Sequence, residues 1–191
     1  MTPTIIVLDD ESSVAFNVAH AIATLGWNPV VCPLSLTDAA RLDELAPTHI
    51  VLVTGQSPAV SQPVIDTLVA ARLGHTALIG IGQGALALGA ALGLSVPHER
   101  PVSPGLVEVC HDGCLAFGNL KYRFRAWMPR LPRLRREALP DCLEMTATTP
   151  TGLLLGFRHR THPCEGVLFH PESSGTPDGL QWFANVFGVC A

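Results

Sequence analysis

The chain has no long hydrophobic run and little charge. None of its apolar stretches approaches the ~20 residues that a membrane-spanning helix requires, so no membrane partner is expected. Charged residues make up only 15% of the 191 residues, and the net charge is -4 at pH 7. This balance excludes the basic surface that is typical of nucleic-acid-binding proteins. The hydrophobic share of 48% is that of a compact globular protein rather than a disordered chain.

The N-terminal segment lacks the basic start and the cleavage-site pattern of a signal peptide. Its apolar stretch ends in Asp9 and Asp10, so we interpret it as a first β-strand and expect a cytoplasmic protein. Free and mostly buried thiols are then expected at the six scattered cysteines, which are Cys32, Cys110, Cys114, Cys142, Cys164 and Cys190. A metal site at Cys110–Cys114 is the alternative, but no second ligand cluster accompanies it, and neither a metal nor a cofactor is expected.

Repeats and low-complexity segments are absent, and the length favours a single domain over residues 1–191. The first half alternates apolar runs with amphipathic segments. It predicts strands over 4–9, 28–33, 49–55 and 76–81, and helices over 12–25, 35–46, 64–74 and 84–93. Within 35–46, the spacing predicts an apolar face of Leu36, Ala40 and Leu45. This alternation is typical of a parallel sheet with helices on both faces.

The second half predicts a small antiparallel extension. A hairpin is expected within 105–117 around Asp112-Gly113, followed by two strands joined at 150–152. A strand beginning at Cys164 and a closing helix over 178–189 complete the pattern. The only charge run contains Arg130, Arg133, Arg135 and Arg136. We interpret it as a solvated loop, with a partner-binding patch as the alternative.

One expected side chain is missing from the stretch LIGIGQGALALGAALG, residues 78–93. A buried strand, a Gly-rich turn and a small-residue helix are typical of a nucleophile elbow. The nucleophile's position is Gly82, which has no side chain. An aspartate is likewise missing at the end of the third predicted strand, which excludes a phospho-acceptor receiver domain despite Asp9 and Asp10.

The stretch GFRHRTHPCEGVLFHPESSGTPDG, residues 156–179, resembles the class I glutamine amidotransferases. Within that family the chain is most similar to the glutaminase subunits of anthranilate synthase and aminodeoxychorismate synthase. The resemblance extends over the whole chain and implies a flavodoxin-like three-layer α/β fold. It also implies a Cys thiolate that attacks glutamine, a His that acts as base and acid, and a Glu that orients the His. The ammonia would pass to a partner subunit that uses chorismate.

Carried over residue by residue, the resemblance makes His170 the catalytic His, Glu172 the orienting Glu and Gly82 the position of the missing Cys. It assigns the glutamine pocket and the oxyanion loop to Gly55, Gln56, Ser57, Gln83, Arg125 and Ala126. Several of these positions depart from the family pattern. Ala126 stands in place of a Ser, Leu168 in place of a Gln, and VSPG at 102–105 in place of a segment that contacts the synthase. These departures put glutamine binding in doubt.

Three functions remain open on the sequence. The first is a non-catalytic subunit that binds a chorismate-using synthase. The second is an enzyme that uses His170 and Glu172 for new acid–base chemistry, although the pair can also persist by ordering its own turn. The third is a weakly active amidotransferase subunit. Cys164 is interpreted as a buried thiol, with a catalytic role as the alternative.

Overall fold

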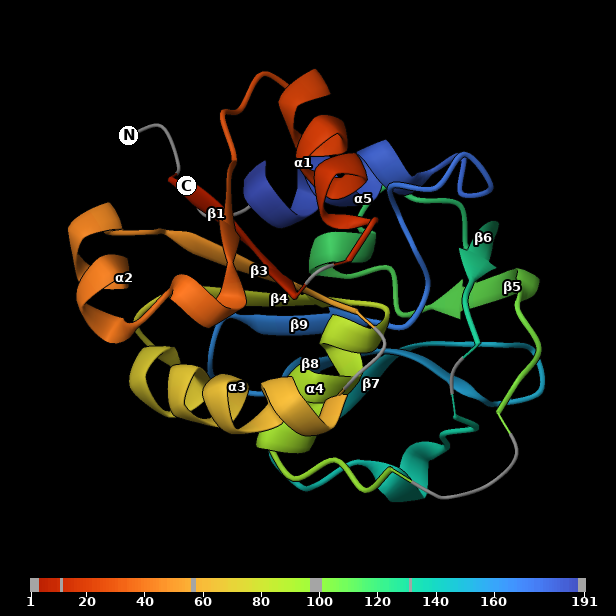
Figure 1. Cartoon of the computed structure of the whole chain (residues 1–191). Coiled ribbons are helices and arrows are strands. Elements are labelled where there is room, and N and C mark those ends of the chain that lie inside the picture. Colours follow the sequence, from red (N-terminus) through yellow and green to blue (C-terminus); the bar gives the residue numbers. More distant parts are fainter. Residues whose placement is uncertain (1–3, 11, 56–57, 97–100, 131, 189–191) are drawn as a thin grey trace.

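The computed structural model describes residues 4–10, 12–55, 58–96, 101–130 and 132–188, without the side chains of residues 58–60. A single nine-stranded mixed sheet runs through the molecule (Figure 1). Its strand order is β2 (Val30–Pro33), β1 (Ile5–Asp10), β3 (His49–Thr54), β4 (Ala77–Ile81), β9 (Cys164–Val167), β8 (Leu154–His159), β7 (Leu143–Thr148), β5 (Gly105–His111) and β6 (Arg123–Met128).

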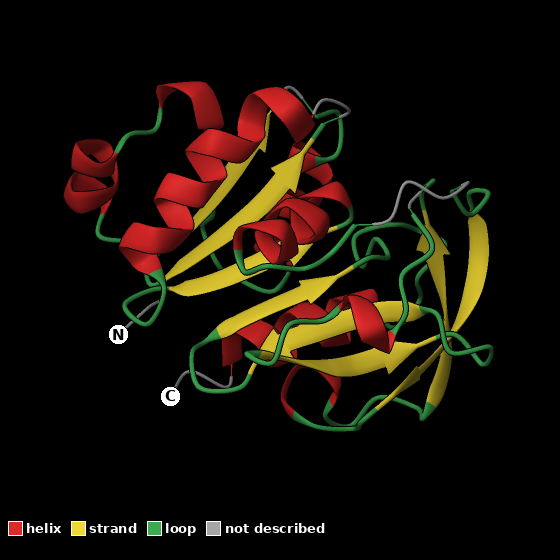
Figure 2. Ribbon diagram, turned by 90° about the horizontal axis from the view of Figure 1, so that it is seen from below, coloured by secondary structure: helices red, strands yellow, loops and turns green. Residues whose placement is uncertain are grey.

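Helices cover both faces of the parallel part of this sheet, as the alternation predicts (Figure 2). One face carries α1 (Ala15–Thr24) and α5 (Gly179–Gly188), and the other carries α2 (Ala39–Leu45), α3 (Pro58–Arg72) and α4 (Gln83–Ala91) (Figure 1). Short 3-10 helices are η1 (Leu34–Leu36), η2 (Leu115–Phe117) and η3 (Arg136–Ala138). Among the described residues, no helix is long and apolar enough to cross a membrane.

Strand β1 explains why its sequence is a continuous apolar run. Ile5 and Val7 lie in the hydrophobic cluster that includes residues of α1 and α5, whereas Ile6 and Leu8 lie in the cluster that includes residues of α2 and α3. All four side chains are buried. Successive side chains of a strand point to opposite faces, so a strand covered on both faces needs apolar residues at every position.

The antiparallel part of the sheet is as extensive as the parallel part, and not the small extension that the sequence predicts. β2, β1, β3, β4 and β9 pair in parallel, whereas β9, β8, β7, β5 and β6 pair antiparallel. The predicted strands joined at 150–152 are confirmed as β7 and β8, and the predicted closing helix is confirmed as α5. The side chains of the four loop arginines are exposed, as expected of a solvated loop.

The predicted hairpin around Asp112-Gly113 is wrong. Strand β5 pairs instead with β6, which begins only at Arg123. The residues between them form η2, where Phe117 is fully buried and stacks on His111 with ring centroids 5.0 Å apart. The apolar residues of this segment therefore fill the core and do not extend the ladder.

The predicted apolar face of segment 35–46 is also wrong. Leu34 and Leu42 are buried, whereas Leu36 is 77% exposed. The helix begins later than predicted because Thr37 is extended and Asp38 accepts a hydrogen bond from the Arg41 backbone N–H as the N-cap residue. Leu36 therefore lies before the helix, in η1, and Leu42 is the buried residue of α2.

Candidate functional site

The elbow is a strained turn that joins β4 to α4. Gly82 has a φ of +57° and a ψ of −119°, a conformation that side-chain-bearing residues rarely adopt. Its N–H donates a hydrogen bond to the Val167 carbonyl at 2.8 Å. The turn is thereby fixed to the end of β9, the strand that leads to His170.

Close packing explains the small residues that follow the elbow. A Cβ on Gly84 would overlap the carbonyl oxygen of Leu52, so only glycine lets α4 lie directly on β3 at this point. Residues 84–89 of α4 are all buried. The Gly-rich sequence therefore positions the helix against the sheet whether or not the elbow carries a nucleophile.

His170 is held by its backbone as well as by its side chain. It forms an isolated antiparallel bridge with Trp127, whose carbonyl accepts from the His170 N–H at 2.8 Å. The Thr176 hydroxyl donates to the His170 carbonyl at 2.7 Å and accepts from the Trp127 N–H at 3.0 Å. Thr176 is not among the residues that the sequence predicts, although the polar turn HPESSGT contains it.

The side chains of His170 and Glu172 form a buried pair. His170 Nδ1 lies 2.6 Å from Glu172 Oε1, and the two side chains are only 13% and 4% exposed. A carboxylate only accepts, so Nδ1 carries a proton, and in the neutral ring Nε2 keeps its lone pair. The other oxygen, Glu172 Oε2, is buried without a hydrogen-bond partner among the described residues.

The His170 ring occupies the space in front of the elbow. A Cβ placed on Gly82 would lie 2.7 Å from Nε2 and 3.1 Å from Cε1 of this ring. The Gly82, His170 and Glu172 positions predicted from the sequence are thus brought together. In this arrangement the lone pair of Nε2 lies directly beside the backbone of residue 82, with no room for a larger residue unless the ring shifts.

The remaining predicted pocket residues are not assembled in the same way. Gln56 and Ser57 lie outside the described residues, and Gly55 and Gln83 are half-buried at the end of β3 and the start of α4. Arg125 is exposed and Ala126 is fully buried, because neighbouring residues of β6 point to opposite faces of the sheet. The two side chains therefore do not line one common pocket.

The apolar side chains of Leu86, Leu168 and Trp127 differ in their burial. Leu86 and Leu168 are 8% and 1% exposed and belong to the core, whereas Trp127 stays 39% exposed.

The described cysteines offer no replacement nucleophile at the elbow. Cys164 is buried, as expected, and burial raises the pKa of its thiol to about 12. It begins β9, whereas His170 follows the other end of that strand. Among the described residues, no group of three or more His, Cys, Asp and Glu side chains is arranged to hold a metal ion, and Cys32, Cys110, Cys114, Cys142 and Cys164 are free.

Comparison with known proteins places this geometry in one family. The model of the family "Glutamine amidotransferase class-I" matches residues 6–190. Anthranilate synthase component 2 of Pseudomonas putida is 30% identical over 95% of this chain and 94% of its own length. Aminodeoxychorismate synthase component 2 of Serratia marcescens is 31% identical over 95% and 97%.

Solved structures agree on the fold. A GMP synthase subunit from Thermoplasma acidophilum superposes with a TM-score of 0.83 at 22% identity, over 100% of this chain and 95% of that one. The structure of PurLQS from Thermotoga maritima gives a TM-score of 0.76 at 17% identity, over 100% of both chains. Together with the match over nearly the whole sequence, these findings show that the chain belongs to the class I glutamine amidotransferase family.

Proposed function

We propose that this chain is a non-catalytic glutamine amidotransferase-like subunit that binds a chorismate-using synthase of the anthranilate or aminodeoxychorismate type. The observation that carries the proposal is the contact between the elbow and the dyad of His170 and Glu172. Gly82 has no side chain to act as a nucleophile, and Nε2 of the His170 ring lies 2.7 Å from the position that a Cβ would take. The pair that would serve a thiolate is present, but nothing at residue 82 can form a thioester.

The loss of a covalent nucleophile has a large expected cost. Removing such a group alone lowers kcat by roughly 10⁶-fold in a hydrolase that works through a nucleophile and a histidine. The free cysteines near the sheet do not compensate, because the Cys164 thiol stays protonated in the core. We therefore expect the isolated chain to hydrolyse glutamine no faster than the background reaction.

A partner subunit is supported by the relatives and by the surface beside His170. The relatives are named as second components of synthases, which are proteins that work with another component. On this chain, Leu106 of β5 and Trp127 of β6 lie directly opposite each other and are 53% and 39% exposed. Since the Trp127 backbone bonds to His170, this apolar pair borders the dyad and offers a docking surface.

The proposal is tested with the chorismate-using synthase component from the same cell. We expect the two chains to form a stable complex that makes its product with ammonium but not with glutamine. Glutamate release and glutamine-dependent product are measured beside those of Pseudomonas putida anthranilate synthase component 2. Glutamine-dependent turnover of a comparable size, or no complex with either type of synthase, would contradict the proposal.

The docking surface carries its own prediction. Truncating Leu106 and Trp127 to alanine together is expected to weaken the complex by about 10- to 100-fold, since buried aromatic anchors dominate interface energies. Leu36→Ala is the matched control, because Leu36 is also highly exposed but lies in η1. Titration calorimetry measures both. Equal weakening by the control, or none by the double variant, would place the interface elsewhere.

A new acid–base activity is the second candidate, and the intact pair of His170 and Glu172 favours it. Their 2.6 Å contact leaves Nε2 free to take a proton from a bound molecule. Such an enzyme would lose its turnover in His170→Ala, whereas a docking subunit would keep the stimulation of its partner. A weakly active amidotransferase would instead release glutamate in the complex.

A further inference from the structure

A cavity lies at the opposite end of the parallel strands from His170. It has a volume of about 230 Å³ and is lined by residues at the starts of β3, β4 and β9, by the end of β8, and by α5 and η2. Its polar lining consists of His49, Arg158, His159, His162, Glu165 and Asn185. The chemistry proposed above uses none of these side chains.

Glu165 brings to this cavity a carboxyl group that accepts no hydrogen bond from the described residues. It lies opposite Arg158 in the ladder of β9 and β8. Two nitrogens of the Arg158 guanidinium are taken, because Nη2 donates to Asp112 Oδ2 at 2.5 Å and Nε donates to Glu144 Oε1 at 2.6 Å. Its third nitrogen, Nη1, is buried without a partner among the described residues and does not donate to Glu165. Among the described residues no side chain or backbone group donates to Glu165, and its Oε1 is completely buried. A donor supplied by a ligand would satisfy it.

The local charges compensate Glu165 only in part, because Arg158 favours its carboxylate whereas burial and Asp112 oppose its ionisation. Arg158 is balanced by Asp112, and Arg160 pairs with Glu144 at 3.2 Å. The carboxylate of Glu165 would therefore add one net negative charge to this group. Burial raises the pKa of Glu165 to about 8, so the group stays neutral until a cation or a rise in pH accompanies its ionisation.

His49 supplies a second acceptor. The Thr48 hydroxyl donates to the Thr4 carbonyl at 3.1 Å, so it accepts from His49 Nδ1, which lies 2.8 Å away. The ring therefore presents a lone pair on Nε2, which is buried without a partner among the described residues. Burial also lowers the pKa of His49 and keeps the ring neutral.

We propose that this cavity binds small primary ammonium compounds with an apolar body. The ammonium group donates to Glu165, and His49 accepts from a further donor of the ligand. The hydrocarbon part lies against apolar lining residues such as Ala77, Ile79 and Val186. Each polar group of the ligand then meets an acceptor that the protein itself leaves open, which is the arrangement expected of a small-molecule site.

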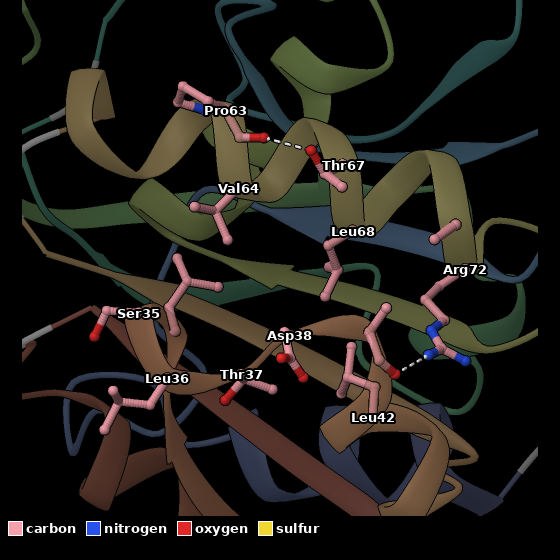
Figure 3. Close-up of a pocket in the computed structure, with 13 residues that line it drawn as sticks. Ser35, Leu36, Thr37, Asp38, Leu42, Pro63, Val64, Thr67, Leu68 and Arg72 are labelled. Carbon is pink, nitrogen blue, oxygen red and sulfur yellow. Dashed lines mark hydrogen bonds between the residues drawn. The ribbon is translucent and has the colours of Figure 1, made fainter.

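The larger groove between α2 and α3 lacks this complementarity (Figure 3). Its volume is about 540 Å³ and its walls are mostly apolar, including Leu42, Val64 and Leu68. The cationic side chain at one end, Arg72, reaches across to α2 and is already paired with Asp43 at 2.6 Å and with the Ala39 carbonyl at 3.0 Å. The charge of Arg72 is thus already balanced by Asp43.

The proposal is tested by calorimetric titration of the whole chain with n-butylammonium chloride at about pH 9. Near this pH Glu165 is ionised and an alkylamine, with a pKa like that of lysine, still carries its proton. We expect saturable binding, and binding about tenfold or more weaker for n-butanol, which has a similar shape but no charge. Equal binding of the alcohol, or no saturable heat up to ~0.1 M amine, would overturn the proposal.

Two variants locate the site. Glu165→Gln keeps the shape of the side chain and is expected to weaken n-butylammonium binding by about tenfold or more. Glu137→Gln is the matched control, because Glu137 is exposed on η3, and its affinity should equal that of the unaltered chain. Val186→Phe leaves Glu165 in place and reduces the cavity, so it should also weaken binding. Undiminished binding in both Glu165→Gln and Val186→Phe contradicts the site.

Discussion

Replacing Gly82 with alanine is expected to lower the free energy of unfolding by about 3 kcal/mol. Part of this loss comes from the backbone, because a φ of +57° strains any residue that carries a Cβ. The rest comes from His170, whose Nε2 lies 2.7 Å from the position of that Cβ. Moving the ring stretches its bond to Glu172 and leaves a carboxyl group that is 4% exposed without its partner. Urea denaturation of the variant measures the sum.

A matched glycine separates the two contributions. Gly26 has a φ of +88°, but nothing lies within 4 Å of a Cβ built on it, so Gly26→Ala should show the backbone strain alone, about 1 kcal/mol. In a His170→Ala background the cost of Gly82→Ala should fall toward the same value. If Gly82→Ala and Gly26→Ala destabilise equally in the unaltered chain, the His170 ring does not occupy the elbow.

The same contact bears on how this site reached its present form. The ring of His170 and a side chain at residue 82 compete for the same space. The observed position of the ring therefore requires glycine at the elbow. The tie between the Gly82 N–H and Val167 is independent of any side chain. The turn can therefore still join β4 to α4 when residue 82 carries no nucleophile.

The parallel half of the fold could be predicted because its signals are local. Continuous apolar runs such as that of β1 alternate with amphipathic segments, and both patterns are complete within a few residues. The antiparallel half depends on pairings between distant segments. The partner of β5 could not be read from the turn at Asp112-Gly113, because burial of Phe117 in the core outweighs local hairpin propensity.

The candidate site likewise has residues that local sequence predicts and residues that it does not. His170 and Glu172 are two residues apart, so a stiff turn at Pro171 brings them together, and the sequence predicts the pair. Arg125 and Ala126 are adjacent, but strand periodicity sends them to opposite faces, a point that the motif resemblance overlooks. The cavity lined by His49, Arg158 and Glu165 is assembled only by the register of separate strands. No local sequence pattern predicts it.

The stability of the chain is expected to fall as the pH rises from about 4.5 to about 8, to the extent that Glu165 controls it. In the unfolded chain this group loses its proton near 4.5, whereas in the folded protein burial raises its pKa to about 8. Between these values the folded state holds a proton that the unfolded state has released. Stability then decreases by up to ~1.4 kcal/mol per pH unit. Because water reaches part of the side chain, we expect a total of about 2 kcal/mol.

Glu165→Gln isolates this effect from the other groups that titrate. Burial lowers the pKa values of His49 and His159, and this raises stability with pH below about 6.5, opposite to the effect of Glu165. Denaturation midpoints of the variant and the unaltered chain are therefore compared pairwise from about pH 5 to 9. The difference should grow in favour of the variant up to about pH 8 and then level off. A constant difference would mean that Glu165 ionises normally in the folded protein and that burial does not raise its pKa.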